Sequence, residues 1–519
     1  MLIKTFASAV QGVDAITITV EVNAGGTVAQ DKIGYVLVGL PDNAVKESYH
    51  RMEAAIKNVG YSMKRVKTVV NLAPANIRKE GSSYDLPIAM AILGATRQLN
   101  NASELQNYVM MGELALDGSL RPIKGALPMA IQARKQNFKG IFVPKENARE
   151  AAIVNNLEVY GINNILEVIE YFNGERQLSP MKLDTREEFS YTIGKYDLDF
   201  SDVKGQENIK RALEIAAAGG HNVILIGPPG AGKTMLARRL PTILPPLNLH
   251  EALETTKIHS VAGLLPPDSA LVTQRPFRSP HHTVSDVALV GGGSNPLPGE
   301  ISIAHNGVLF LDELPEFKRT VLEVLRQPME ERRITISRAK ITVDYPSSFM
   351  LIASMNPCPC GYYNHPNKDC VCSPGVVKKY LNKISGPLLD RIDLHVEVTP
   401  VSYEELAKYE RTSEPSSAIV ERVVQARKKQ DQRFEEMPRI FSNAQMSSKM
   451  VRDICRISKA GTVLLKNAME KLQLSARAYD RILKVARTCA DLSNSDEIGI
   501  EHLAEAIHFR SLDREDWLG

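Results

Sequence analysis

The sequence has no long apolar run. No stretch of roughly eighteen consecutive apolar residues occurs along it, so we expect no membrane-spanning helix. Residues 1–22 carry one lysine and an alternating apolar pattern, without the apolar block and small-residue cleavage site of a signal peptide. We therefore expect the chain to begin with a strand of a folded domain and to reside in the cytoplasm.

The sequence also contains few cysteines and carries little net charge. Six cysteines among 519 residues cannot form a disulfide framework. Lysine and arginine (63) nearly balance aspartate and glutamate (60), and the net charge of +3 gives no global attraction for nucleic acid. Any surface that binds nucleic acid must therefore be a local patch. The composition, 44% hydrophobic and 24% charged, is typical of a soluble globular protein.

The pattern of elements predicts an α/β protein in four segments. Residues 1–175 alternate β-like runs with helical segments, as a small α/β domain does. Residues 176–199 are polar and weakly periodic, which indicates a linker. Residues 200–400 show a βα pattern that predicts a parallel sheet, and residues 401–519 are helical. The periodic helical runs of this last segment are 417–434, 449–472, 476–492 and 500–510.

The strongest motif is NVILIGPPGAGKT, from Asn222 to Thr234. A buried strand is followed by a glycine-rich loop, whose backbone N–H groups can surround a phosphate, and then by a helix with its positive end toward that charge. Lys233 is expected to reach the β- and γ-phosphates of ATP, and the Thr234 hydroxyl to ligate Mg²⁺. The expected nucleotide contacts are Gly227, Pro228, Pro229, Gly230, Ala231, Gly232, Lys233 and Thr234.

Two further strands end in polar residues that suit phosphoryl transfer. The apolar strand from Gly307 ends in Asp312 and Glu313. We expect Asp312 to hold Mg²⁺ and Glu313 to polarise the attacking water, because the carboxyl ends of parallel strands face one site. Asn356 follows the strand 350–354 and could orient that water.

Two arginines are candidates for stabilising charge in the transition state. Arg391 lies in the segment GPLLDRID, and Arg477 begins a helix near the C-terminus. Taken alone, either arginine is more readily explained as a solvated surface charge. The residues by themselves leave these two alternatives open.

Four of the six cysteines fall within residues 358–372. They form two C-x-C pairs separated by nine residues, and four thiolates at such spacing can close a tetrahedral Zn²⁺ site. C-x-C is less typical than C-x₂-C, because ligands so close together strain the chelate. Free buried cysteines are the alternative, and His365 is a substitute ligand. The candidate ligands are Cys358, Cys360, Cys370 and Cys372.

These motifs, in this order, resemble the magnesium-chelatase-like branch of the AAA+ ATPases, and more closely the ComM/YifB family. The resemblance extends over essentially the whole chain. Besides the P-loop, the stretches that carry it are DVKGQE at 202–207, RPFRSPHHT at 275–283, GGGSNPLPGE at 291–300, KISGPLLDRID at 383–393 and LSARAYDR at 474–481.

The resemblance implies an AAA+ core with a helical lid, acting as a homo-oligomeric ring that we expect to be a hexamer. Asn356 then matches the sensor-1 position, Arg391 an arginine finger that acts across a subunit boundary, and Arg477 the sensor-2 arginine. The implied activity is ATP-driven unwinding and branch migration of DNA, which supports integration of DNA in natural transformation. The implied partner is single-stranded or branched DNA, bound without sequence preference.

Motor rings of this kind grip DNA with loops that line the pore. The candidates here are the glycine-rich stretch 291–299 and the hairpin-like stretch 332–343, with Arg338 and Lys340 near its tip. A positive tip would contact phosphates without reading bases, although an ordinary hairpin with solvated charges is an equal alternative. A second basic cluster is a candidate for DNA or subunit contact and consists of Arg275, Arg278, His281 and His282.

Residues 1–170 resemble the fold of the Lon protease domain. Ser83 falls near the nucleophile position of that family, where a serine needs a lysine as its general base. The matching lysine position holds Leu127, and Lys124 lies three residues too early. We therefore expect a non-catalytic platform rather than a protease.

Other functions remain as alternatives to the DNA motor. A magnesium-chelatase-like motor or chaperone would act on a protein client, as would a regulatory ATPase ring. An ATP-dependent protease is disfavoured by Leu127. DNA-stimulated ATP hydrolysis would separate the DNA motor from these alternatives.

Overall fold

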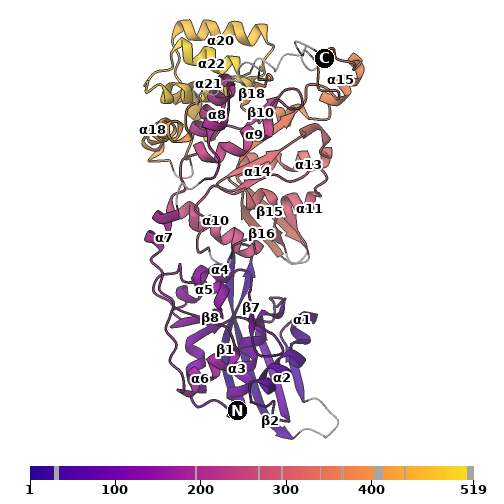
Figure 1. Cartoon of the computed structure of the whole chain (residues 1–519), viewed down its shortest axis with the longest axis vertical. Helices are drawn as coiled ribbons and strands as arrows, with labels where there is room; N and C mark the ends of the chain where they lie inside the picture. The colour runs from indigo at the N-terminus through magenta and orange to yellow at the C-terminus, as the bar shows by residue number, and fades with distance from the viewer. Residues whose placement is uncertain are drawn as a thin grey trace. The chain divides into compact units, whose positions relative to one another are not determined.

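The computed structural model folds into two compact units (Figure 1). The N-terminal unit consists of Met1–Thr192 and Asn248–Thr273, and the C-terminal unit of Ile193–Leu247 and Gln274–Gly519. Across the residues that the structure describes, no helix is both long and apolar enough to cross a membrane. The described residues are 1–27, 34–192, 196–266, 269–293, 296–338, 341–363, 365, 368–401, 413–437 and 440–510.

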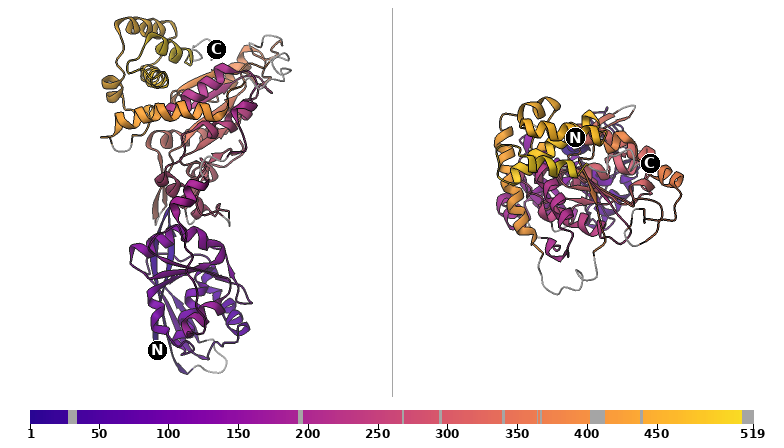
Figure 2. Two further views of the ribbon diagram at one scale, coloured as in Figure 1. Left: turned by 60° about the vertical axis from the view of Figure 1, so that its left-hand side comes forward. Right: turned by 90° about the horizontal axis from the view of Figure 1, so that it is seen from above.

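The N-terminal unit is built on a mixed seven-stranded sheet (Figure 2). β1 pairs antiparallel with β2 and β2 with β4, whereas the other neighbours are parallel. In sheet order the strands are β3 (Tyr35–Val38), β4 (Val66–Ala73), β2 (Asp14–Thr27), β1 (Leu2–Gln11), β5 (Tyr108–Met110), β8 (Gly140–Pro144) and β9 (Glu158–Ile162). A short hairpin joins β6 (Glu113–Leu114) and β7 (Leu120–Arg121).

Helices pack around this sheet according to their apolar faces. The helix α3 (Asp85–Ala95) is apolar on almost every side and is buried along its whole length, against β1 and β2. The other helices of this unit are α1 (Asn43–Lys46), α2 (Ser48–Asn58), α4 (Ala126–Lys135), α5 (Lys145–Ala151), α6 (Ile165–Asn173), α7 (Thr185–Thr192) and α10 (Leu249–Ala262).

The packing of the N-terminal unit differs from the predicted segments in two respects. Much of the stretch predicted as a linker packs onto this unit: Leu178, Met181 and Leu183 contact its core, and the stretch leads into α7. Residues 248–273, predicted to belong to the core domain at 200–400, also fold here, because α10 packs on α4 and the Ser260 carbonyl accepts the Gly125 N–H at 3.1 Å. Local periodicity describes a helix but does not identify its packing partner.

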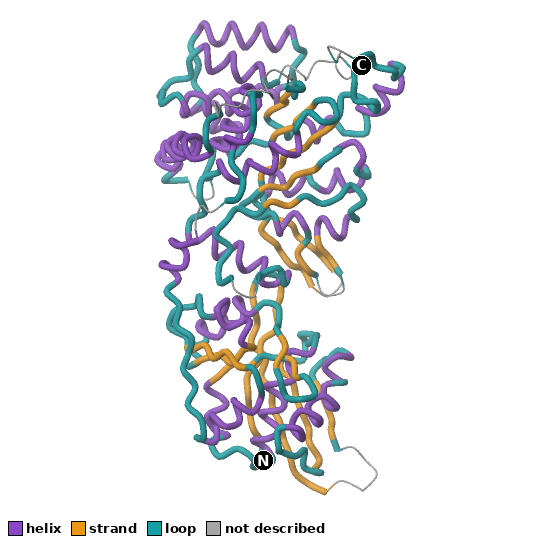
Figure 3. Tube along the Cα trace, viewed as in Figure 1, coloured by secondary structure: helices purple, strands orange, loops and turns teal. Residues whose placement is uncertain are grey.

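The C-terminal unit contains a five-stranded, entirely parallel sheet (Figure 3). Its three central strands are buried at every position, which explains their continuous apolar sequences. In sheet order the strands are β11 (Phe277–Arg278), β14 (Val308–Leu311), β17 (Met350–Met355), β10 (Val223–Ile226) and β18 (Leu394–Glu397). Since β17 lies between β10 and β14, the ends of these three strands meet at one edge.

Short helices and two hairpins complete this α/β part. The helices are α8 (Glu207–Gly219), α9 (Lys233–Arg239), α11 (Asp286–Val290), α12 (Glu300–Ile303), α13 (Arg319–Val324), α14 (Arg326–Glu331), α15 (Pro374–Leu381) and α16 (Gly386–Leu389). The hairpins pair β12 (Gly291–Gly292) with β13 (Leu297–Pro298), and β15 (Arg333–Arg338) with β16 (Ile341–Pro346). The predicted α/β class with a parallel sheet is thus confirmed.

The last part of the chain is helical, as predicted. The helices are α18 (Ser416–Phe434), α19 (Ser448–Ile454), α20 (Lys459–Lys471), α21 (Ala476–Leu492) and α22 (Ile500–His508). The run 449–472 was expected as one helix and is two, because the Ser458 side chain accepts the Gly461 N–H and starts α20 afresh. These helices share one hydrophobic core with α8 and the parallel sheet.

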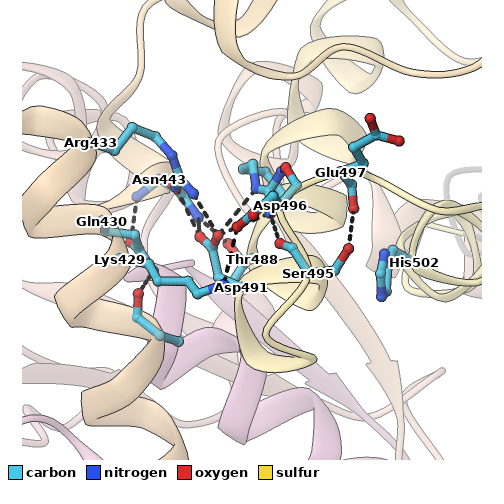
Figure 4. Close-up of polar contacts among 12 residues, drawn as sticks. Lys429, Gln430, Arg433, Asn443, Thr488, Asp491, Ser495, Asp496, Glu497 and His502 are labelled. Atoms are coloured by element: carbon cyan, nitrogen blue, oxygen red, sulfur yellow. Dashed lines mark hydrogen bonds and ion pairs between the residues drawn. The ribbon is translucent and has the colours of Figure 1, made fainter.

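A buried ionic cluster holds the helical part together (Figure 4). The carboxylate of Asp491 has no exposed surface and pairs with Arg433 at 2.6 Å and Arg487 at 3.1 Å. It also accepts a hydrogen bond from the Asn443 amide at 2.8 Å. Both of its oxygens are therefore satisfied, as a buried charge requires.

Candidate nucleotide-binding site

The predicted P-loop connects β10 to α9 and lines a cavity of about 430 Å³. Gly230 and Gly232 have φ angles of 78° and 87°, in the left-handed region that glycine adopts without strain. At Gly227 a Cβ atom would lie 2.2 Å from the carbonyl oxygen of Val398, so no side chain fits there. The loop can therefore keep its backbone N–H groups directed at a bound phosphate.

Lys233 is held among neutral acceptors at the wall of this cavity. Its ammonium donates to the carbonyls of Gly227 (2.6 Å) and Pro228 (2.9 Å) and to Oδ1 of Asn356 (3.0 Å). Burial lowers the pKa of Lys233, because the charged form loses hydration, while the nearby carboxylates of Asp312 and Glu313 oppose that shift. A phosphate would supply the counter-charge that the neutral acceptors do not.

Asp312 and Thr234 form the opposite wall. The Thr234 hydroxyl donates to Oδ2 of Asp312 at 2.7 Å, and the Ser354 hydroxyl donates to Oδ1. A hydroxyl and a carboxylate at this separation are the oxygen ligands that Mg²⁺ takes beside ATP. Ser354 is a residue that sequence reasoning missed, although its place near the end of β17 could have indicated it.

Glu313 follows Asp312 in a left-handed backbone conformation, with φ of 54°. Its side chain is 57% exposed, and Oε2 lies 3.6 Å from Nδ1 of His282. The rings of His281 and His282 lie against each other, with centroids 4.0 Å apart. The sequence placed these histidines in a basic cluster, whereas the structure brings His282 to the predicted catalytic carboxylate.

Asn356 comes directly after β17 and reaches the same cavity. There its Oδ1 accepts the hydrogen bond from the Lys233 ammonium at 3.0 Å. The structure therefore brings Lys233, Thr234, Asp312, Glu313 and Asn356 together around one cavity.

The two predicted arginines lie elsewhere. Neither is among the described residues that line the cavity. Arg391 is 9% exposed and pairs with Glu330 at 2.5 Å, while donating to the Pro387 carbonyl at 2.6 Å. Arg477 is exposed and lies 3.2 Å from Asp390, the residue before Arg391. Both arginines thus belong to one region, apart from the P-loop of their own chain.

The two candidate DNA loops pack against each other. A Cβ at Gly292 would lie 3.1 Å from the guanidinium of Arg338, and a Cβ at Gly291 would lie 2.9 Å from Ile336. The Tyr345 hydroxyl donates to the Pro296 carbonyl at 2.6 Å. Arg338 is exposed, whereas Lys340 lies outside the described residues.

The other members of the predicted basic cluster have structural partners. Arg275 donates to the carbonyls of Pro245 (2.5 Å) and Asn306 (2.7 Å). Arg278 forms a two-pronged ion pair with Glu300 at 2.6 and 2.8 Å. These two arginines brace loops of the C-terminal unit, and they do not form an open basic patch with the histidines.

The residues that the resemblance to the Lon fold singles out all lie in the N-terminal unit. Leu127 is buried in α4, and its backbone N–H donates to Glu150 at 2.8 Å. Lys124 is exposed and lies against Gly263, where a Cβ would come within 2.7 Å of its Cε. Ser83 lies in the short helix Ser82–Tyr84.

The four clustered cysteines converge in the structure. Their sulfur atoms all lie within 4.8 Å of one another. His365, the predicted substitute ligand, instead stands edge-on to the Tyr362 ring, with centroids 5.5 Å apart.

The strand order, the P-loop at the end of β10 and the acidic pair at the end of β14 define a P-loop ATPase of the AAA+ class. The chain is 43% identical to competence protein ComM of Haemophilus influenzae over 512 residues (98% of this chain, 97% of ComM) and 44% identical to YifB of Escherichia coli K12 over 506 residues (97% and 96%). The chain belongs to the ComM/YifB family.

Comparison with family descriptions supports the same assignment. Residues 199–406 match "Magnesium chelatase, subunit ChlI", residues 20–147 match "Subunit ChlI of Mg-chelatase", and residues 413–510 match "Magnesium chelatase, subunit ChlI C-terminal". The magnesium-chelatase-like AAA+ family implies an ATPase that uses ATP and Mg²⁺. Lon protease 2 of Bacillus subtilis is 31% identical over 150 residues, which cover 27% of this chain and 26% of that protein. This weaker similarity accords with the predicted Lon-like fold.

Proposed function

We propose that this protein is a ring-forming, Mg-ATP-dependent DNA motor that acts in the cytoplasm and drives branch migration. Its role would be to support integration of DNA in natural transformation or recombination. The observation that carries the proposal is the convergence of five phosphoryl-transfer residues in one cavity, in a chain similar over its full length to a competence protein.

Within the cavity each side chain has a distinct task. The P-loop and Lys233 bind the phosphates of ATP, and Lys233 exchanges neutral acceptors for phosphate oxygens. Thr234 and Asp312 would hold Mg²⁺, which would supply positive charge beside the transferring phosphoryl group. Glu313 accepts a proton from the attacking water at its carboxylate, and Asn356 orients that water.

The two arginines act on the nucleotide of a neighbouring subunit. Arg391 and Arg477 lie together and outside the cavity of their own chain, so they complete a site only across a subunit boundary. Assembly, expected to be a hexamer, is therefore a condition for turnover.

DNA contacts come from the two packed hairpins. The exposed guanidinium of Arg338 beside Gly292 suits the phosphate backbone of single-stranded or branched DNA, without preference for sequence. The hairpins are also close along the chain to a contact of the catalytic carboxylate. His282 lies 3.6 Å from Glu313, and only α11 lies between the segment of His282 and β12. The N-terminal unit serves as a non-catalytic platform, since Leu127 offers no general base.

The family matches also favour a second candidate function. A motor related to the chelatase subunit ChlI could remodel a protein client rather than DNA. Neither candidate function involves zinc, so neither explains why the four cysteines cluster.

Steady-state ATP hydrolysis with and without branched DNA tests the proposal, with the Glu313→Gln variant as control. We expect strong stimulation by DNA that the variant lacks. Turnover that depends on Glu313 but ignores every DNA offered would contradict the DNA motor and favour the protein client. Absence of turnover would contradict the ATPase mechanism.

A further inference from the structure

The four clustered cysteines have the geometry of a metal site. The sulfur of Cys358 lies 3.3 Å from Cys360 and 3.7 Å from Cys370, and the latter two are 3.6 Å apart. Four sulfurs bound tetrahedrally at about 2.3 Å from Zn²⁺ stand ~3.8 Å from one another. The observed separations are close to this value and far above the ~2.05 Å of a disulfide bond.

Burial does not explain why these thiols meet. Free cysteines that serve as small apolar residues are expected inside a core, as Cys455 and Cys489 are. Within the cluster only Cys358 is buried, and the other three side chains are partly exposed. A partly exposed loop that gathers four thiols gains little from apolar packing, so a ligand accounts for the convergence better than a core does.

We propose that Cys358, Cys360, Cys370 and Cys372 bind one Zn²⁺ as thiolates. We further propose that this site holds Asn356 and Pro229 in place at the nucleotide cavity. Binding forms four Zn–S bonds and releases four protons to solvent, with no change in oxidation state. Four thiolates around one Zn²⁺ carry a net charge of −2. A backbone N–H group offsets part of this charge: that of Tyr363 donates to Cys358 at 3.3 Å.

The cysteine loop is tied directly to the nucleotide cavity. Cys358 stands two residues after Asn356, which accepts the hydrogen bond from Lys233. At Gly361, with φ of 83°, a Cβ would lie 2.5 Å from Cδ of Pro229. The turn of the cysteine loop therefore rests on the P-loop itself, and only a residue without a side chain allows this contact.

The other end of the loop leads into α15, which begins at Pro374, two residues after Cys372. Zinc would thus fix a loop that follows Asn356 closely and whose turn at Gly361 rests on Pro229, so its removal should free Asn356 and Pro229 together. A displacement of about 1 Å in a positioning group can cost roughly 10²-fold in rate.

The metal part of the proposal is tested on the purified full chain. We expect about one zinc per chain by elemental analysis after dialysis against metal-free buffer, with other metals absent. The Cys370→Ser/Cys372→Ser variant should lose the zinc, and the control Cys455→Ala, which lies in the helical part, should keep it. A zinc-free native chain, or equal zinc in the double variant, would overturn the site.

The link to catalysis rests on the proposed ATPase function and is tested separately. The double-cysteine variant should hydrolyse ATP roughly 10²-fold more slowly than the native chain. Because that variant could fail to fold, Gly361→Ala provides an independent route: it keeps all four ligands but adds a methyl group against Pro229. We expect Gly361→Ala to retain zinc and to raise the KM for ATP at least several-fold, whereas Lys368→Ala in the same loop should change neither.

The two failures can be told apart. Normal ATP hydrolysis in a zinc-free or Gly361→Ala chain would overturn the link while leaving the ATPase assignment intact. Conversely, a native chain that holds zinc but hydrolyses no ATP would contradict the proposed function and leave the metal site standing.

Discussion

Replacing Arg391 by alanine tests whether catalysis is shared between subunits. In its own chain Arg391 pairs with Glu330 and lies outside the nucleotide cavity, so we expect its catalytic partner to be the ATP of the next subunit. A finger arginine that stabilises the transition state from a neighbouring chain contributes about 10³–10⁵ in turnover. Arg391→Ala should therefore lose nearly all ATP hydrolysis.

The stability of the same variant is measured beside its rate. Glu330, the partner that the change leaves behind, is 56% exposed and can be hydrated by solvent. Arg391 itself is 9% exposed and also donates to the Pro387 carbonyl, so its removal takes away a buried side chain as well as an ion pair, and a denaturant titration measures that cost. Arg391→Lys is a matched variant, because it keeps the positive charge but removes the planar fork of donors.

Mixing two inactive variants tests whether each ATP site is built from two subunits or whether Arg391→Ala is defective within its own chain. Arg391→Ala subunits keep an intact cavity, and Glu313→Gln subunits keep an intact arginine. In a ring assembled at random from equal amounts of the two variants, about a quarter of the nucleotide sites would combine the intact cavity of one subunit with the intact Arg391 of its neighbour. We expect ATP hydrolysis to recover toward that fraction when the two proteins are mixed and reassembled. If the mixture stays inactive although mixed rings form, or if Arg391→Ala alone is active, Arg391 does not act on the nucleotide of the next subunit.

Three further perturbations follow from the described contacts. Arg338→Ala should reduce the salt dependence of DNA binding by about one unit of slope, because one phosphate contact is lost; binding titrations at several salt concentrations measure this. His282→Ala should raise the basal ATPase rate up to roughly fivefold and lower the stimulation by DNA, since Glu313 loses its 3.6 Å contact with His282. Asp491→Ala should lower the free energy of unfolding by about 3–5 kcal/mol in denaturant titrations, because Arg433 and Arg487 would keep charges without their buried partner.

Each of these has a contrary result. An unchanged salt slope would remove Arg338 from the DNA surface, with Arg333→Ala as the comparison on the same hairpin. A His282 variant whose basal rate and DNA stimulation match the native chain would show that the contact with Glu313 is incidental. If Asp491→Ala unfolds at the native denaturant concentration, the buried cluster does not hold the helical part.

The nucleotide cavity could be predicted from sequence because its parts are local or lie at strand ends. The P-loop is continuous, and Asp312 and Asn356 each follow a buried apolar strand. Parallel strands must bring their carboxyl ends to one edge, so no long-range information was needed. The observed order, with β17 between β10 and β14, places Asn356 between Lys233 and Asp312.

Contacts between distant segments could not be predicted in this way. His282 lies near Glu313 because β11 and β14 are neighbours, a fact that neither strand encodes by itself. The proximity of Arg477 to Asp390 depends on how α21 packs against α8 and α18. Likewise, the spacing of the cysteines allowed a metal site, but only the fold brings the two pairs within reach of each other.

The chain passes between its two compact units three times, after Thr192, Leu247 and Thr273. A single proteolytic cut at the exposed residues Asp197 or Leu198 would therefore not release the N-terminal unit, because residues 248–273 remain part of it. A fragment that ends at residue 192 would likewise lack α10 and expose the surface of α4 that α10 covers. The N-terminal unit is thus built from two separate stretches of the chain. A single fusion at the N-terminus could not have added the whole unit, and a single truncation there cannot remove all of it.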